Sequence, residues 1–179
     1  TVSSSLDWLH IATSGDHTLS IKSDYTLWSW GNNYFGQLGL NSTAKFSSPI
    51  QVGTFTSWLS IATFGNNSAA INVSGQLWVW GSNSYGLLGD NTSTHKSSPV
   101  QTVAGGSTWE QVAVGKNHMA AIKSDSTLWL WGSNRYGKLG DSTTVHRSSP
   151  VQTISGGTDW SQVACGDDHT AAIKTDGSL

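Results

Sequence analysis

The stretch LWSWGNNYFGQLG at residues 27–39 returns as LWVWGSNSYGLLG at 77–89 and as LWLWGSNRYGKLG at 128–140. Each copy joins two tryptophans, spaced two residues apart, to a segment rich in glycine and asparagine. A fixed period of this kind predicts an architecture built from stacked copies of one unit, and it takes precedence over local secondary-structure signals.

The repeat covers the chain of 179 residues. Tryptophans mark it at steps of 50, 51 and 51 residues, at Trp8, Trp58, Trp109 and Trp160. We divide the single segment 1–179 into the repeats 8–57, 58–108 and 109–159 and the partial repeat 160–179. The partial repeat stops inside an LWxWG strand and would leave an exposed strand edge. We therefore expect the rest of a longer chain, or alternatively a homo-oligomer, to close the ring.

Each unit has the pattern of four short strands. Apolar residues alternate in WLHIAT at 8–13, and TLSIK at 18–22, LWSWG at 27–31 and PIQV at 49–52 follow between turns. No segment shows a capped helical stripe. The sequence predicts an all-β β-propeller of four-stranded blades, with about three and a half repeats of 50–51 residues present. A parallel β-solenoid is the alternative, although its rungs repeat over shorter periods.

The repeated residues also predict how the blades pack. Trp30, Trp80 and Trp131 are large enough to fill the wedges between neighbouring blades. The small residues of SAAI, MAAI and TAAI suit a strand near the propeller axis, where blades crowd. Cys165 takes the place of Thr13, Thr63 and Val114 in the other units, so we interpret it as a small half-buried strand residue.

The repeat is similar to that of a known family. WSQVACGDDHTAAIKTDGSL at 160–179, and the whole unit 109–152, resemble the repeats of the regulator of chromosome condensation family. This chain departs from the pattern at Asn67–Ser68, where a His–Thr pair is usual, and at Leu40, where an aspartate is usual. The resemblance implies a seven-bladed β-propeller, of which this chain would supply about half. The near-identical units look most similar to bacterial or bacteriophage members.

Catalytic chemistry is not predicted. The histidines that invite it, His17, His118 and His169, occupy the same position in three units, and one site would not need three separated copies. We interpret them as structural turn histidines that hydrogen-bond to the backbone. The sequence has no zinc-ligand spacing such as CxxC or HExxH. We therefore expect no metal, no cofactor and no enzyme activity.

Composition excludes two further classes of function. Charged residues make up 11% of the chain and the net charge is −2, which gives no basic footprint for nucleic acid. No apolar run approaches the roughly 20 residues that span a bilayer, so membrane insertion is not expected.

Recognition is expected where the repeats differ. Variation concentrates in the polar loops between LWxWG and SSP, and functional residues often lie on loops held by a rigid scaffold. We predict a rim that binds a protein partner of unknown identity, with aromatic and arginine anchors. The predicted rim comprises Tyr34, Lys45, Phe46, His95, Lys96, Arg135, Lys138, His146 and Arg147.

These patterns favour a non-enzymatic protein-interaction or structural module. A surface or virion-associated component of a larger bacterial or phage protein fits the resemblance, with an extracellular, cell-surface or virion location favoured over a nuclear one. The family resemblance leaves two alternatives: a guanine-nucleotide exchange factor for a small GTPase, or an inhibitor of a secreted enzyme.

Overall fold

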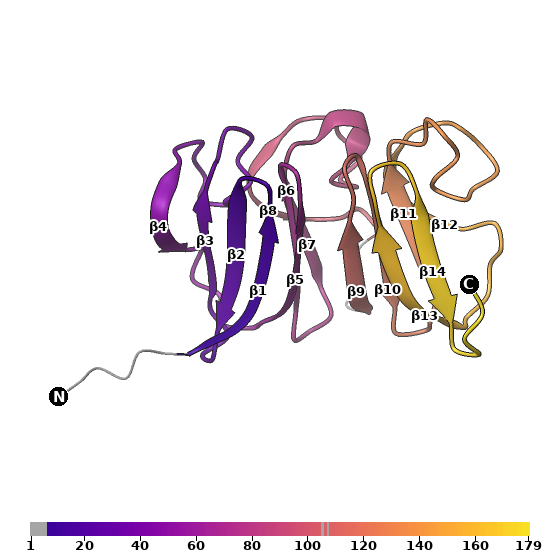
Figure 1. Ribbon diagram of the computed structural model, residues 1–179, viewed down its shortest axis with the longest axis horizontal. Coiled ribbons are helices and arrows are strands. Elements are labelled where there is room, and N and C mark those ends of the chain that lie inside the picture. Colours follow the sequence, from indigo (N-terminus) through magenta and orange to yellow (C-terminus); the bar gives the residue numbers. More distant parts are fainter. Residues whose placement is uncertain (1–6, 105, 107) are drawn as a thin grey trace.

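The computed structural model describes residues 7–104, 106 and 108–179, so the first six residues of the predicted segment 1–179 lie outside it. Strands over the described residues form three four-stranded antiparallel sheets and one two-stranded sheet. These sheets stand side by side as blades, with the sheet of β1–β4 at the left and the sheet of β13–β14 at the right of Figure 1. The predicted all-β fold with four-stranded blades is confirmed.

Each blade is an antiparallel meander of consecutive strands. Blade 1 contains β1 (Trp8–Ser14), β2 (His17–Lys22), β3 (Leu27–Gly31) and β4 (Phe46–Gln51). Blade 2 contains β5 (Trp58–Phe64), β6 (Asn67–Asn72), β7 (Leu77–Gly81), the 3-10 turn η1 (Ser84–Gly86) and β8 (Lys96–Gln101). Blade 3 contains β9 (Trp109–Val114), β10 (His118–Lys123), β11 (Leu128–Gly132) and β12 (Arg147–Gln152). The half-blade contains β13 (Trp160–Cys165) and β14 (Thr170–Lys174).

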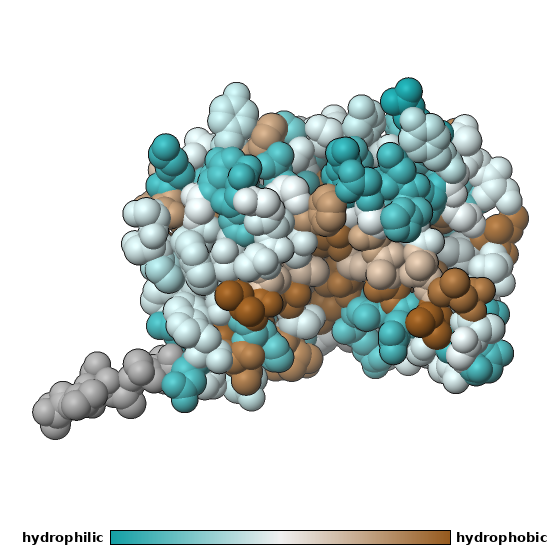
Figure 2. Space-filling view, in the orientation of Figure 1, coloured by the Kyte–Doolittle hydropathy of each residue, from teal (hydrophilic) through white to brown (hydrophobic). Residues whose placement is uncertain are grey.

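The meander sends all the long loops to one edge of the sheets. Strands β1 and β3 run in the same direction, so the β1–β2 turns and the β3–β4 loops emerge together at the upper edge of Figure 1. The long loops are residues 32–45, 82–95 and 133–146. Figure 2 shows hydrophilic side chains gathered over this edge, while apolar ones show mainly in the lower half. No helix of the described residues is long and apolar enough to cross a membrane.

The first strand of each blade lies innermost. β1 contacts β5, β5 contacts β9, and β9 contacts β13. The alanine-containing second strand is next to it and is buried between blades, as at Ala69, Ala70, Ala120 and Ala121. Small side chains are needed there because neighbouring sheets approach closely on both sides.

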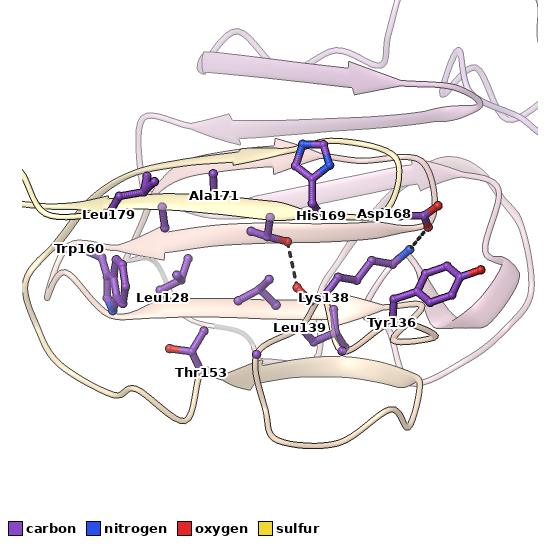
Figure 3. A pocket seen from close by; sticks show the side chains of 15 residues that line it. Leu128, Tyr136, Lys138, Leu139, Thr153, Trp160, Asp168, His169, Ala171 and Leu179 are labelled. Atoms are coloured by element: carbon purple, nitrogen blue, oxygen red, sulfur yellow. Dashed lines mark hydrogen bonds and ion pairs between the residues drawn. The ribbon is translucent and has the colours of Figure 1, made fainter.

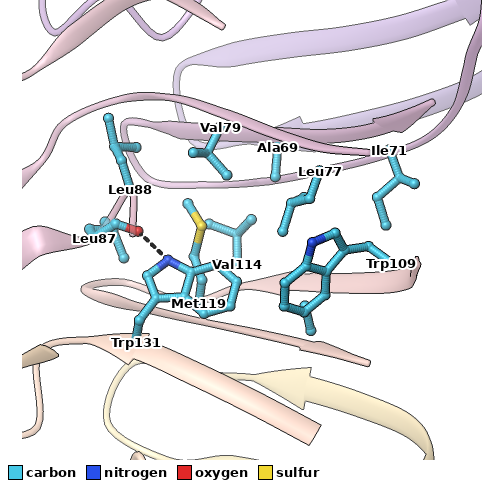
Figure 4. Packing of buried hydrophobic residues seen from close by; sticks show 11 residues of the cluster. Ala69, Ile71, Leu77, Val79, Leu87, Leu88, Trp109, Val114, Met119 and Trp131 are labelled. Carbon is cyan, nitrogen blue, oxygen red and sulfur yellow. Dashed lines mark hydrogen bonds between the residues drawn. The ribbon is translucent and has the colours of Figure 1, made fainter. Parts of the chain in front are cut away.

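The core lies between blades. Between blades 2 and 3, Leu77, Val79 and Leu88 face Trp109 and Trp131 across a closely packed interface, shown in Figure 4. Two similar clusters fill the other two boundaries. A single blade could not bury its own apolar face, so each boundary stabilises two blades at once.

The second tryptophan of each LWxWG strand packs against the preceding blade. Trp80 Nε1 donates to the carbonyl oxygen of Gln37, and Trp131 Nε1 donates to that of Leu87, both at 2.8 Å. Both indole rings are fully buried, whereas Trp30 is partly exposed, since no preceding blade lies against it in the described part of the chain. These tryptophans therefore occupy the interblade wedge wherever a preceding blade is present.

Glycine allows the tryptophans to approach the preceding blade. A Cβ atom at Gly39 or Gly89 would lie 2.9 Å from the indole nitrogen of Trp80 or Trp131. The two glycines also have φ angles of +73° and +62°, which side chains with a Cβ rarely adopt. Both constraints explain why the LWxWG…LG pattern ends in glycine.

A histidine joins blade 1 to blade 2. His17 Nε2 lies 2.8 Å from Ser68 Oγ, and the Ser68 hydroxyl donates to the carbonyl oxygen of Gln37 at 2.7 Å. Since the hydroxyl proton is used in this way, the imidazole must carry its proton on Nε2. The histidine therefore contacts a side-chain hydroxyl across the blade boundary, and its Nδ1 lies 2.9 Å from Ser14 Oγ of its own blade.

The same arrangement joins blade 3 to the half-blade. His118 Nε2 lies 2.9 Å from Thr170 Oγ1, and the Thr170 hydroxyl donates to the carbonyl oxygen of Lys138 at 2.9 Å. Burial lowers the pKa of His118 and of His17 to about 4, so both imidazoles are neutral near pH 7. His169, the third member of the set, is exposed on the half-blade. We call the boundary between blades 1 and 2 and the boundary between blade 3 and the half-blade the polar boundaries.

The boundary between blades 2 and 3 uses different residues. Asn67 replaces the histidine, Met119 replaces the hydroxyl residue of the next blade, and Leu87 stands at the position of Gln37. Met119 and Leu87 are buried in the apolar cluster, and Asn67 instead donates to the carbonyl oxygen of Ser82 in its own blade. We call this contact the apolar boundary.

Two sides of the arc have no neighbouring blade in the described residues. On the β1 side Trp8 is 48% exposed, although its counterpart Trp58 in blade 2 is 2% exposed. On the β14 side, residues including Leu128, Leu139 and Trp160 line a hollow of about 470 Å³, shown in Figure 3. Both sides present residues of the kind that the covered boundaries bury.

Candidate functional site

The long loops are held by one buried asparagine each. The side chain of Asn83 accepts the backbone N–H of Leu88 at 2.8 Å and donates to the carbonyl oxygens of Thr92 and Thr94 across the loop. Asn33 and Asn134 make the corresponding bonds in the other two loops, and all three side chains are fully buried. The loops are therefore fixed platforms, because their backbone groups are satisfied from within.

An aspartate adds a second brace in two of the loops. Asp141 accepts hydrogen bonds from Thr143, Asn134 and Arg147. Burial alone would raise the pKa of Asp141, but these bonds lower it to about 2. Asp90 is held in the same way, with Lys96 at 3.3 Å as its ion-pair partner.

This brace corrects the predicted place of three rim residues. Lys96 and Arg147 are not loop residues: each begins the fourth strand of its blade and is half-buried against its aspartate. Phe46 likewise begins β4 and is half-buried. The strands extend further toward the loops than the SSPVQ motif indicated, because Gly31, Gly81 and Gly132 pair with these residues.

Lys138 is also not a free rim residue. Its side chain is 2% exposed, and its Nζ lies 2.9 Å from the Asp168 carboxylate of the half-blade, as Figure 3 shows. Hydrogen bonding to Lys138 in turn lowers the pKa of Asp168. Lys138 therefore links two blades and offers no open surface to a partner.

The exposed anchors of the loops are aromatic. Tyr34, Tyr85 and Tyr136 are 76%, 53% and 63% exposed. The aromatic position shared by Phe35, Tyr85 and Tyr136 contacts the histidine of the following loop, with Phe35 at 5.2 Å from His95 and Tyr85 at 4.9 Å from His146 between ring centroids. These contacts place the aromatic side chains in a row along the loop edge, from one blade to the next.

The two loop histidines are oriented by the backbone. His95 Nδ1 accepts the N–H of Asn83 at 2.8 Å, and His146 Nδ1 accepts that of Asn134 at 2.9 Å. Both histidines remain exposed on their other side. They position the neighbouring aromatic ring and still present an edge to solvent.

Several of these groups converge above blade 3. Tyr85, Arg135, Tyr136 and His146 line a hollow of about 240 Å³, together with Lys116 from the β9–β10 turn. The Arg135 guanidinium lies 5.4 Å from the centre of the Tyr136 ring, within the range of a cation–π contact. We call the surface formed by Tyr34, Tyr85, Lys116, Arg135, Tyr136 and His146 the loop surface.

The structure thus brings together only part of the predicted rim. Arg135 and His146 share the hollow, while Tyr34, Lys45 and His95 lie on the neighbouring loops as exposed residues. Tyr85 and Tyr136 are not part of the predicted rim, because the rim was drawn from positions that vary between units and this position is aromatic in each complete unit. The φ angle of +62° at Tyr85 turns this side chain outward from a tight turn, a feature that the sequence pattern alone does not reveal.

Matches to known repeats follow the same units. The model of the regulator of chromosome condensation (RCC1) repeat matches residues 26–71, 74–122 and 125–173. A second model of that repeat matches residues 8–37 and 109–138. The chain belongs to the RCC1 repeat family. The predicted family is therefore confirmed.

Two relatives with this repeat are eukaryotic proteins. The chain is 30% identical over 170 residues to the ultraviolet-B receptor UVR8 of Arabidopsis thaliana, which covers 94% of this chain and 28% of that protein. It is 32% identical over 168 residues to the human E3 ubiquitin-protein ligase HERC2. This alignment covers 90% of the present chain and 4% of HERC2.

A solved RCC1-type structure shares the fold. Prp20p from Saccharomyces cerevisiae superposes with a TM-score of 0.81 at 20% identity, over 92% of this chain and 43% of that one. The chain spans less than half the length of each of these proteins.

Proposed function

We propose that this RCC1-repeat segment is a protein-binding module that uses the loop surface as its contact face. The observation that carries the proposal is the row of exposed tyrosines, with Arg135 beside Tyr136, on loops fixed by buried asparagines. Tyrosine and arginine are enriched at binding hot spots. Rigid loops also lower the entropy lost when a partner binds.

The relatives support binding by this fold. Prp20p binds Gsp1p and histones, and UVR8 is a receptor. A protein partner for the present chain is the corresponding proposal. The bacterial or phage origin of the chain, and its location outside the cell or on a virion, stay predictions from the sequence. UVR8 and HERC2 are eukaryotic proteins.

The buried titratable groups make structural contacts between blades. His17 and His118 are buried at blade boundaries, where each contacts a hydroxyl that already donates to a carbonyl. Burial raises the pKa of the Cys165 thiol to about 12, so it is not a nucleophile near pH 7. Over the described residues, no three histidine, cysteine or acidic side chains cluster as a metal site requires.

A guanine-nucleotide exchange factor is the second candidate, because Prp20p shares the fold and binds Gsp1p. Its test is the rate of nucleotide release from a panel of small GTPases with and without this protein, and unchanged rates would remove the candidate. An inhibitor of a secreted enzyme would bind its target through the same loop surface.

The contact face is tested by placing a photo-crosslinking benzoylphenylalanine at Tyr85 or Tyr136. Asp176 provides the control position, since it is exposed in the turn after β14 at the opposite edge. We expect the same partner to be crosslinked from both loop positions and not from Asp176. Equal capture from Asp176 would contradict the proposal.

A triple substitution then measures the energetic contribution of the face. Replacing Tyr85, Arg135 and Tyr136 by alanine should weaken the crosslinked partner's binding about tenfold or more while the melting temperature stays unchanged. Lys138 and Arg147 are left intact, because both support the fold through ion pairs. Unchanged affinity would refute the loop surface as the contact face.

A further inference from the structure

Each complete blade carries a pair of tryptophans near the edge opposite the long loops. One belongs to the first strand and the other is the first tryptophan of LWxWG. The ring centroids lie 6.3, 6.3 and 6.5 Å apart, at interplanar angles of 87°, 79° and 79°, in Trp8–Trp28, Trp58–Trp78 and Trp109–Trp129. The three pairs therefore form the same aromatic corner.

In blades 1 and 3 a lysine of the second strand occupies this corner. Lys22 Nζ lies 4.9 Å and 3.9 Å from the ring centres of Trp8 and Trp28. In blade 3 the Nζ of Lys123 lies 4.7 Å and 4.6 Å from its two ring centres. The corner is thus a cation site, because an ammonium group is attracted to the faces of indole rings.

Blade 2 has the corner without the lysine. Asn72 stands at the lysine position, and its side chain is turned to its own hairpin, where Nδ2 donates to Gln76 Oε1 at 2.7 Å. Asn72 Oδ1 accepts the backbone N–H groups of Ser74 and Gln76. No cation of blade 2 lies over Trp58 and Trp78 among the described residues.

A third aromatic residue stands beside the corner in blade 2. Phe55 lies 6.3 Å from Trp58 and 6.1 Å from Trp78 between ring centroids, and it is 57% exposed. The linkers before blade 3 and the half-blade have Gly106 and Gly157 at this place. We call Phe55, Trp58 and Trp78 the aromatic slot.

The aromatic slot opens into a groove along the outer part of the boundary between blades 1 and 2. The groove has a volume of about 470 Å³, and Phe46 and Ile50 of blade 1 line its other wall. In the hairpin of blade 2, Trp78 Nε1 is buried without a hydrogen-bond partner. The equivalent Trp28 Nε1 donates to Thr26 Oγ1 at 2.8 Å.

We propose that the aromatic slot of blade 2 binds a lysine side chain of a partner protein. The ammonium group lies against the exposed Phe55 ring and the half-buried Trp78 ring, with the buried Trp58 as the floor of the slot, and the apolar groove accommodates the aliphatic stem. This inference rests on the proposed protein-binding function only because a partner must supply the lysine. The residues of the slot all belong to this chain.

The slot is tested with n-butylammonium, which reproduces a lysine side chain, and with n-butanol as the uncharged control. The readout is the indole N–H resonances of the intact chain in ¹H–¹⁵N spectra. We expect the resonances of Trp58 and Trp78 to shift with butylammonium. Butanol should bind at least about fivefold more weakly than butylammonium. An equal response to butanol, or shifts confined to other tryptophans, would overturn the proposal.

Three variants make the assignment specific. Asn72→Lys should abolish the response by supplying the ammonium in cis, and Lys123→Asn should create a second response at Trp109 and Trp129. Phe55→Gly should weaken binding if Phe55 is a wall of the slot. Tighter binding by Phe55→Gly, or a wild-type response of Asn72→Lys, would overturn the proposal.

Failure here is distinguishable from failure of the loop-surface proposal. The butylammonium titration requires no partner, whereas the crosslinks from Tyr85 and Tyr136 require no slot. Once a partner is in hand, Asn72→Lys should weaken its binding severalfold while Lys22→Asn should not. Equal effects of these two substitutions would refute the lysine of the partner as the occupant.

Discussion

The polar and apolar boundaries both join neighbouring blades, but they do so with different side-chain contacts. Between blades 1 and 2, His17, Ser68 and Gln37 form a chain of hydrogen bonds, while Asn67, Met119 and Leu87 leave the boundary between blades 2 and 3 apolar. The tryptophan that bonds a carbonyl of the preceding blade is the same in both. What differs is a set of three residues that change together.

This difference teaches that each boundary is matched on both sides. A histidine facing Met119 would be buried without an acceptor, and such unpaired groups cost about 1–3 kcal/mol. The substituted residues at Asn67 and Met119 therefore compensate each other across two blades. We therefore expect the boundary chemistry to favour one order of blades over another.

The largest expected effect tests what the two kinds of boundary share. Trp131→Ala removes a fully buried ring and its bond to the Leu87 carbonyl, so the free energy of unfolding should fall by about 3–5 kcal/mol. Urea denaturation measures the loss. Trp30→Ala is the control, because its ring is partly exposed and its substitution should cost less. Equal losses would show that burial between blades is not what stabilises the tryptophans.

The next effect separates the boundaries by pH. The folded-state pKa of His17 and of His118 lies below the ordinary value of 6.5, at about 4, so the folded state binds protons less readily than the unfolded state. Stability is fully present above pH 6.5 and should fall between pH 6.5 and pH 4, by about 2–3 kcal/mol for each histidine.

A variant in which both histidines and their hydroxyl partners are replaced by the residues of the apolar boundary provides the control for this pH window. This variant combines His17→Asn with Ser68→Met and His118→Asn with Thr170→Met. Its free energy of unfolding should stay nearly constant between pH 6.5 and 4. The loss due to Asp141 should persist, because its pKa moves from 3.8 to about 2 and its window lies lower. An unchanged profile above pH 4 would refute the assignment to the histidines.

A smaller effect tests whether the substituted residues compensate. Met119→Thr should destabilise the apolar boundary by about 1–3 kcal/mol, through a lost apolar contact and a buried hydroxyl. Adding Asn67→His should restore part of this loss, since the histidine then has its usual partner. A double-mutant cycle measures the coupling, which would be zero if the two positions were independent.

The smallest effect is expected at the rim of the boundary between blade 3 and the half-blade. Lys116→Ala removes an exposed ion pair with Asp167 and should leave the melting temperature unchanged. Lys138→Ala should lower it, because Lys138 is buried and bonded to Asp168. A larger loss from Lys116→Ala would mean that exposed charge, and not burial, decides the stability of this boundary.

The fold was predictable because its signal is repeated. The period of Trp8, Trp58, Trp109 and Trp160 sets the blade length, and alternation sets the strands. The boundary chemistry was not predictable, because the partner of His17 is Ser68, about one repeat further along the chain. Only the relative position of two blades reveals that pairing.

The candidate site was predictable only in part, for two physical reasons. Constancy between repeats does not distinguish burial from exposure, so the predicted rim left out Tyr85 and Tyr136 although both are exposed. Variation does not distinguish free charges from paired ones. Lys138 and Arg147 vary between repeats, yet each is held by an aspartate that the sequence alone does not place beside it.

The register of the matched repeat against the blades bears on how such chains lengthen. The first match, 26–71, begins at β3 of blade 1 and ends in β6 of blade 2, and the match at 125–173 likewise joins blade 3 to the half-blade. The first and third copies carry both sides of a carbonyl–hydroxyl contact, as with Lys138 and Thr170, and the second carries Leu87 and Met119 of the apolar boundary. Tandem duplication of one such unit would therefore insert a ready-made joint, and a gene could gain a blade without first evolving a new interface.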